Sequence, residues 1–288
     1  PISPAFARYA VYWAPDAKDV LRSFGEAWLG HDPATDGHAM ARNRLGLPDE
    51  FVDRITAEPL RYGLHATLKA PFRLKSGVTQ EHLAEAVQSL ARRNSAFATP
   101  PLRLTCLDGF LALCPSAPSS QLDDLACDCV TGLDHLRAPL DAQELARRRP
   151  DRLSPAQRRL LDAWGYPYVL SEFRFHITLT GRLTSEERDQ VAPVLGAATA
   201  QFCGTPFAVR SIALFGDPGG GVEALVIGGL DHVGDRPAGA REARLATVRG
   251  RLDDDADVGH ASCLLLPRRL ALPARDLVLG LAGSAAFG

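Results

Sequence analysis

Two short segments of the chain carry the same pattern of a histidine, any residue, a threonine and a leucine. They are His65-Ala66-Thr67-Leu68 and His176-Ile177-Thr178-Leu179. An imidazole, with an ordinary pKa of about 6.5, can accept or donate a proton near neutral pH, and a threonine hydroxyl can donate to a phosphate oxygen. Two copies therefore supply the groups for cutting a phosphodiester, one histidine taking a proton from water while the other protonates the leaving oxygen.

Each motif lies in a segment that alternates polar and apolar residues, as a half-buried β-strand does. These segments are 62–74, YGLHATLKAPFRL, and 171–183, SEFRFHITLTGRL. Successive side chains of a strand point to opposite faces, so Lys69, Arg174 and Thr180 should share the histidine faces and line a substrate cleft. Tyr12, on an expected strand over 7–14, is a fourth candidate for binding substrate, although alternation alone does not fix which face of its strand turns inward.

The elements around the motifs are expected in a repeating order. Helices are predicted over 19–29, 79–93, 121–140, 154–165 and 184–202, where Thr79, Ser154 and Thr184 can act as N-caps. A hairpin is predicted over 102–115, turning at Asp108-Gly109, and two further strands around a glycine-rich turn over 207–230. The order strand, helix, strand, helix, strands appears twice, with a histidine strand in each half, which predicts a duplicated α+β fold.

Composition limits the class of protein and its partners. The 288 residues are 46% hydrophobic and 23% charged, as in ordinary globular proteins, and the formal net charge of −2 gives no overall attraction to long nucleic acid or anionic membranes. The six cysteines match neither a disulfide framework nor a zinc site, so we expect reduced thiols. No basic and apolar leader and no stretch of about 18 apolar residues occurs, which favours a cytoplasmic protein.

Other chemistries fit the motifs less well. A zinc site would need a third and usually a fourth ligand at a recognisable spacing, and the threonine of each motif is a poor zinc ligand, so no metal and no cofactor are expected. A G-x-S-x-G nucleophile sequence is absent. A single strand histidine is often only a hydrogen-bonded core residue, but two copies in matching contexts argue against that role.

At these motifs the sequence resembles the two-histidine (2H) phosphoesterase superfamily, which is marked by a pair of H-x-[ST]-hydrophobic motifs in a duplicated α+β fold. More narrowly, RYAVYWAP, YGLHATLKAPF, WGYPYVLSEFRFHITLTGRL and ALFGDPGGG resemble the branch found in bacterial phosphonate-utilisation operons. The resemblance runs from about residue 7 to 220. It implies antiparallel sheets with flanking helices around a central cleft between two lobes.

The resemblance also implies roles for the motif residues. His65 and His176 would be the catalytic acid and base, Thr67 and Thr178 would hold the phosphate, and no metal would be required. The implied substrate is a small cyclic phosphodiester, either a cyclic nucleotide or a cyclic ribose phosphate formed in phosphonate metabolism. The alternative is a module of the same fold that binds a nucleotide or an RNA end without cutting it.

The likeness ends before the last part of the chain. We therefore expect one two-lobed domain over 1–230 and a C-terminal tail over 231–288. The tail is dense in Arg, Ala, Asp, Gly and Leu without a clear strand or helix pattern, so low order is predicted for it and no function is assigned.

Overall fold

The computed structural model describes residues 6–16, 18–30, 42–217 and 223–230. The strands are β1 Arg8–Trp13, β2 Ala66–Phe72, β3 Phe97–Thr99, β4 Leu102–Leu107, β5 Phe110–Pro115, β6 Ile177–Thr178, β7 Phe207–Val209, β8 Ser211–Asp217 and β9 Glu223–Gly229. The α-helices are α1 Val20–Leu29, α2 Asp49–Leu60, α3 Gln80–Arg92, α4 Ser120–Gly132, α5 Ala142–Arg147, α6 Pro155–Trp164 and α7 Ser185–Thr199. The α+β class expected from the sequence is confirmed.

Local side-chain chemistry begins most of the helices where the sequence predicted. Thr79 caps α3 by accepting a hydrogen bond from the backbone N–H of His82. Ser154 and Thr184 form complete capping boxes with Gln157 and Glu187 at the starts of α6 and α7. The Asp108-Gly109 turn joins β4 to β5, and both residues have positive φ, as a tight hairpin turn requires.

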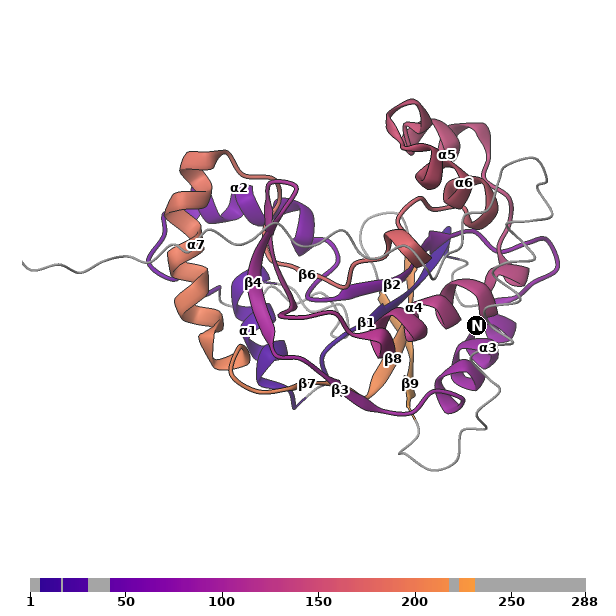
Figure 1. Cartoon of the computed structure of the whole chain (residues 1–288), viewed down its shortest axis with the longest axis horizontal. Helices are drawn as coiled ribbons and strands as arrows, with labels where there is room; N and C mark the ends of the chain where they lie inside the picture. Colours follow the sequence, from indigo (N-terminus) through magenta and orange to yellow (C-terminus); the bar gives the residue numbers. More distant parts are fainter. Residues whose placement is uncertain (1–5, 17, 31–41, 218–222, 231–288) are drawn as a thin grey trace, which may run out of the picture.

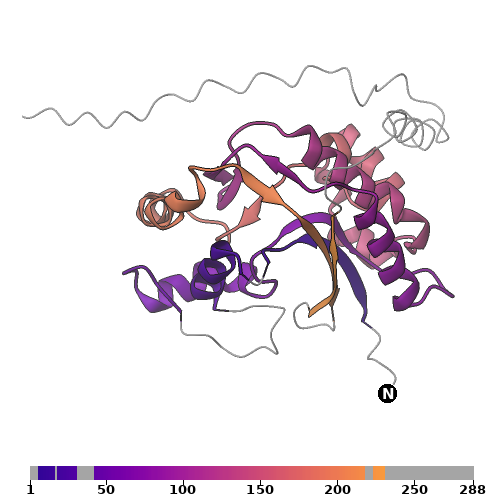
Figure 2. The same ribbon diagram turned by 90° about the horizontal axis from the view of Figure 1, so that it is seen from below.

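Three antiparallel sheets carry the strands. The largest has the strand order β2-β1-β8-β9, and its strand β2 begins within the first motif. A second sheet has the order β4-β5-β6, and its strand β6 lies within the second motif. Strands β3 and β7 form a short pair. In Figure 1, α3, α4, α5 and α6 lie on the side of the four-stranded sheet, and α1, α2 and α7 lie on the side of β4. Figure 2 shows the same division from below.

The two lobes are not the two halves of the sequence. The four-stranded sheet joins β1 and β2 from the beginning of the chain to β8 and β9 from its end. Conversely, α1 and α2 contact the lobe of the second motif: the Trp28 indole N–H donates to the carbonyl of Leu179 at 2.8 Å, and the Gly181 N–H donates to the carbonyl of Ile55. Segments from both halves of the sequence therefore contribute to both lobes, and the duplication expected from the order of elements stays a prediction.

One hydrophobic core continues through both lobes. At their junction the rings of Trp13, Phe175 and Phe207 pack together, with centroids 4.8 to 6.1 Å apart. Trp13 belongs to β1, and Phe175 directly precedes the second motif histidine. Aromatic packing of this kind fixes the position of one lobe against the other.

Several sequence predictions fall on residues outside the described part. These are the glycine-rich turn between β8 and β9 and the whole predicted tail over 231–288. Within the described ranges, none of Cys106, Cys114, Cys127, Cys129 and Cys203 forms a disulfide. None of the helices described there has the length and apolar character needed to cross a membrane.

Candidate active site

His65 directly precedes β2, and this strand is held in place by its neighbours. Thr67 of β2 pairs with Tyr12 of β1 across the sheet. On the opposite face Ala66 and Leu68 are buried in the core. Leu64 packs so closely on Gly25 of α1 that a Cβ on Gly25 would lie 2.6 Å from that of Leu64. The glycine thus allows α1 to approach the motif.

His176 stands directly before β6 in the same way. The strand contains only Ile177 and Thr178, whereas a longer strand was predicted over 171–183. Three contacts nevertheless hold this strand in place. Ile177 pairs with β5, and the Leu179 N–H donates to the Leu111 carbonyl at 2.9 Å. The Trp28 indole N–H donates to the Leu179 carbonyl. Hydrogen bonds from outside the strand therefore replace the missing length.

The two histidines make matching hydrogen bonds to the backbone. Nδ1 of His65 lies 3.0 Å from the carbonyl oxygen of Gly63, and Nδ1 of His176 lies 2.8 Å from that of Arg174. In both cases the partner is the residue two positions earlier. A carbonyl oxygen only accepts, so Nδ1 carries the proton and Nε2 is left for the reaction in both rings.

The surroundings of His65 keep its imidazole neutral. Its ring stacks on Tyr12, with centroids 4.2 Å apart, and Tyr62 lies 6.0 Å away. Burial lowers the pKa of His65 to about 4; the bond to Gly63 opposes this shift, and repulsion from His176 adds to it.

The motif threonines differ from the other predicted threonine. Thr67 and Thr178 are half-buried, and neither hydroxyl has a hydrogen-bond partner among the described residues. Thr180 is fully buried, and its hydroxyl accepts from the Leu111 N–H and donates to the Gly181 carbonyl. The expectation that Thr180 lines a substrate cleft is therefore wrong, because its hydroxyl is already used to hold the end of the second motif.

Lys69 also departs from the prediction. The pairing of β1 with β2 shifts by one residue between Val11 and Tyr12, which turns the Lys69 side chain away from the histidine face. It is only 3% exposed, and its Nζ donates to the Val130 carbonyl of α4 at 3.0 Å and lies 3.8 Å from Asp134. Simple alternation placed Lys69 in the cleft, and the irregular pairing explains why that placement is wrong.

Arg174 and Tyr12 have different surroundings. Arg174 is exposed and precedes the short β6, so strand alternation does not fix its direction; its carbonyl holds His176. Tyr12 is 2% exposed and turns toward His65. Tyr12 therefore shapes the environment of the histidine, and contact of either residue with substrate stays a prediction.

Sequence reasoning missed two aromatic neighbours of the motifs. Tyr62 lies three residues before His65 within the same quoted segment, and Phe110 follows the hairpin turn with its ring 5.7 Å from His176. Tyr62 could have been found from the sequence, because it lies only three residues before the motif histidine. The contact of Phe110 depends on the pairing of β5 with β6 and has no local signal.

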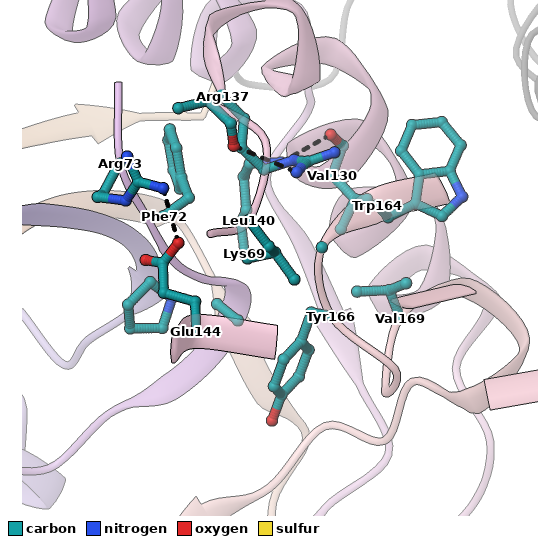
Figure 3. Close-up of a pocket in the computed structure, with 14 residues that line it drawn as sticks. Lys69, Phe72, Arg73, Val130, Arg137, Leu140, Glu144, Trp164, Tyr166 and Val169 are labelled. Atoms are coloured by element: carbon teal, nitrogen blue, oxygen red, sulfur yellow. Dashed lines mark hydrogen bonds and ion pairs between the residues drawn. The ribbon is translucent and has the colours of Figure 1, made fainter. Parts of the chain in front are cut away.

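Charged side chains that pair with one another surround a pocket beside the first motif. It is lined by β2 and by the segments from α4 to α6, and Figure 3 shows Arg73 facing Glu144, with Arg137, Trp164 and Tyr166 nearby. The Arg137 guanidinium donates to Asp134 at 2.7 Å, and that of Arg73 donates to Glu144 at 2.8 Å. The cations in this pocket are thus neutralised by the protein itself.

Over the ranges that the structure describes, no three His, Cys, Asp or Glu side chains come close enough together to hold a metal ion.

The low pKa of His65 predicts a loss of stability in mild acid. From pH 6.5 down to about 4 the unfolded chain binds a proton at this ring that the folded chain does not, so the free energy of unfolding falls with pH across this window. Urea unfolding of the wild type and His65→Gln at pH 7 and at pH 4.5 measures it, with His82→Gln, at an exposed position of α3, as the control. The wild type should lose more stability than His65→Gln; equal losses would contradict the buried, neutral imidazole.

Comparison with curated proteins finds two relatives named ribose 1,5-bisphosphate phosphokinase PhnN. The one from Janthinobacterium sp. (strain Marseille) is 39% identical over 207 residues, which cover 72% of this chain and 46% of the relative. The one from Laribacter hongkongensis (strain HLHK9) is 36% identical over 219 residues, covering 74% and 49%. The chain spans about half the length of these relatives.

Solved structures give more distant likenesses. The structure of E. coli LigT complexed with 3′-AMP is 15% identical and covers 79% of this chain and 100% of that one, with a TM-score of 0.39. A structure titled as a phosphoesterase is 13% identical at the same coverages, with a TM-score of 0.37. Likenesses at this level carry no argument about activity.

A family model matches more than half of the chain. It covers residues 67–223, which include Thr67 of the first motif, all of the second motif and the strands β8 and the start of β9. The chain therefore belongs to the family described as protein of unknown function (DUF1045).

Proposed function

We propose that the protein is a metal-independent phosphoesterase that hydrolyses a small cyclic phosphodiester. The observation that carries the proposal is the pair of equivalent histidines. Each directly precedes a strand, and each donates a hydrogen bond from Nδ1–H to the carbonyl oxygen two residues earlier. A structural histidine has no need of a second copy in matching geometry.

The environments of the rings suggest which histidine does which step. His65 is neutral at neutral pH because it is buried, so its Nε2 can accept a proton from water. The oxygen of that water forms the new bond to phosphorus as the bond from phosphorus to the ribose oxygen breaks. His176, whose backbone hydrogen bond is exposed, donates a proton to the departing oxygen. The product is a ring-opened phosphate monoester.

The hydroxyls of Thr67 and Thr178 would hold the phosphate during this step. They follow the histidines by two residues on the same faces and have no protein partner among the described residues. Donors aimed at non-bridging oxygens stabilise the charge that the transition state carries there.

The names of the curated relatives guide the choice of substrate. Both are named for a kinase acting on ribose 1,5-bisphosphate. The 288 residues contain no G-x-x-x-x-G-K-[ST] phosphate-binding loop, so the kinase activity is not proposed for this chain. A cyclic ribose phosphate, whose opening yields a ribose phosphate monoester, is the substrate class we favour, in agreement with a role in phosphonate metabolism.

A panel of cyclic phosphates tests the activity. The protein is incubated with a 2′,3′-cyclic nucleotide, a 3′,5′-cyclic nucleotide and a cyclic ribose phosphate, and phosphorus NMR follows the appearance of monoester. We expect ring opening of at least one member, unchanged by EDTA. Activity lost with EDTA and restored by zinc would contradict metal independence, and binding without ring opening would identify a non-catalytic module.

A further inference from the structure

The sheet β4-β5-β6 has one face toward the hydrophobic core and one face away from it. The side chains of Leu102, Leu113 and Ile177 are buried in the core, and Leu113 pairs with Ile177 across β5 and β6. Side chains alternate along a strand, so His176 and Thr178 lie on the opposite face, which we call the open face. The open face of this sheet therefore carries the second motif.

The pairing of the strands places Arg103 of β4 on the open face as well. Ala112 of β5 lies opposite Thr178 on one side and opposite Thr105 on the other, and residues directly opposite one another in a sheet share a face. Arg103 precedes Thr105 by two positions and lies opposite Cys114, so it projects from the same face. The register of β4 with β5 is continuous over the whole pairing, unlike that of β1 with β2.

A ring contact supports this assignment independently of the register. Phe110 and Ala112 are two positions apart in β5 and share a side, and the Phe110 ring lies 5.7 Å from that of His176. Neighbouring strands are about 4.8 Å apart, so Arg103 in β4 stands about 10 Å from the motif strand β6. This spacing suits contact with a second group of the substrate rather than with the phosphate beside Thr178.

The charge of Arg103 is available to a ligand. Its side chain is exposed, and within the described part of the chain it has neither an ion pair nor a hydrogen bond. Burial raises the pKa of the Cys114 thiol, and a hydrogen bond with Thr105 and the charge of Arg103 oppose this rise. No carboxylate neutralises that charge on the open face, whose described positions are Arg103, Thr105, Leu107, Phe110, Ala112, Cys114, His176 and Thr178.

We infer that Arg103 binds a second phosphate of the substrate while the two histidine motifs act on its cyclic phosphodiester. The inference rests on the proposed function and narrows the substrate class to a cyclic sugar phosphate that also carries a phosphate monoester. A guanidinium presents two parallel N–H groups that match the oxygens of a phosphate. A ribose acquires anionic groups as phosphate esters of its hydroxyls, so a phosphate monoester is the group that fits this position.

Paired substrates test the role of Arg103. A cyclic ribose phosphate with a free 5-hydroxyl is compared with the same compound carrying a 5-phosphate, and kcat/KM should be about tenfold higher for the second, mainly through KM. In Arg103→Met the ratio of the two kcat/KM values should fall close to one. In the control Arg188→Met, which changes a partly exposed arginine of α7, the ratio should stay as in the wild type. A wild-type ratio in Arg103→Met would overturn the inference.

A binding measurement separates the subsite from the chemistry. His65→Ala is titrated calorimetrically with the same two compounds, and the 5-phosphorylated one should bind about tenfold more tightly. Adding Arg103→Met to His65→Ala should make the two affinities equal, with thermal unfolding confirming that each variant is folded. Absence of ring opening by the wild type together with this binding pattern would refute the phosphoesterase proposal and keep the subsite. Equal binding of the two compounds by His65→Ala would refute the subsite whatever the protein hydrolyses.

Discussion

Alanine in place of His65 or of His176 is expected to lower kcat for the cyclic substrate by about 10² to 10⁴ in each case. The reason is that each ring has its own proton to move, and Nε2 of one cannot perform both transfers at once. Steady-state kinetics of the single variants and of the double variant measure the effect. Because the two groups act in one transition state, the double variant should be little slower than the slower single variant.

The matched control for these variants is His82→Ala. His82 lies in the first turn of α3 and is exposed, so its loss should leave kcat unchanged. Turnover near the wild-type rate by either motif variant would remove that histidine from the mechanism and with it the paired-histidine proposal.

Removal of the buried carboxylate of Asp134 should be the most damaging single change to stability. Asp134 is 2% exposed, accepts from Arg137 Nε at 2.7 Å and lies 3.8 Å from the Lys69 ammonium, which is 3% exposed. Asp134→Ala leaves these buried cations without their carboxylate, a situation that typically costs about 3 to 5 kcal/mol. Urea unfolding followed by circular dichroism gives the change in free energy.

Two further variants sharpen this test. Asp189→Ala removes a carboxylate that is 75% exposed on α7, and it should change stability by less than about 1 kcal/mol. Lys69→Met combined with Asp134→Ala removes one buried charge of each sign and should recover part of the loss. If Asp134→Ala and Asp189→Ala unfolded at the same urea concentration, the buried network would not be a source of stability.

The parts of the fold that the sequence predicted are those decided by neighbouring residues. Thr79, Ser154 and Thr184 bond to backbone groups three residues away, and Asp108-Gly109 supplies the turn conformation itself, so these features need no knowledge of the rest of the chain. Helix α2 was not predicted; Pro59 in its last turn obscures the pattern. The small helix α5 was also missed.

The candidate site divides in the same way. The histidines and threonines could be found because the motif is repeated, which is a property of the sequence. Lys69 and Thr180 were misplaced because the alternation of side chains between the two faces of a strand stops before each of them. Before Lys69 the β1–β2 pairing shifts, and before Thr180 the two-residue strand β6 ends. The contact of Phe110 with His176 depends on how β5 pairs with β6, which periodicity cannot reveal.

The exchange of segments between the lobes also decides when the site can form during synthesis. In the sheet β1 lies between β2 and β8, and the residues of β8 follow those of β1 by about two hundred positions. The second histidine motif packs on Trp13 through Phe175. Pairings this distant in sequence form late and slowly. A chain still on the ribosome can therefore have both histidines outside the exit tunnel and yet lack the sheet that holds them together, so activity should appear only after β8 has emerged.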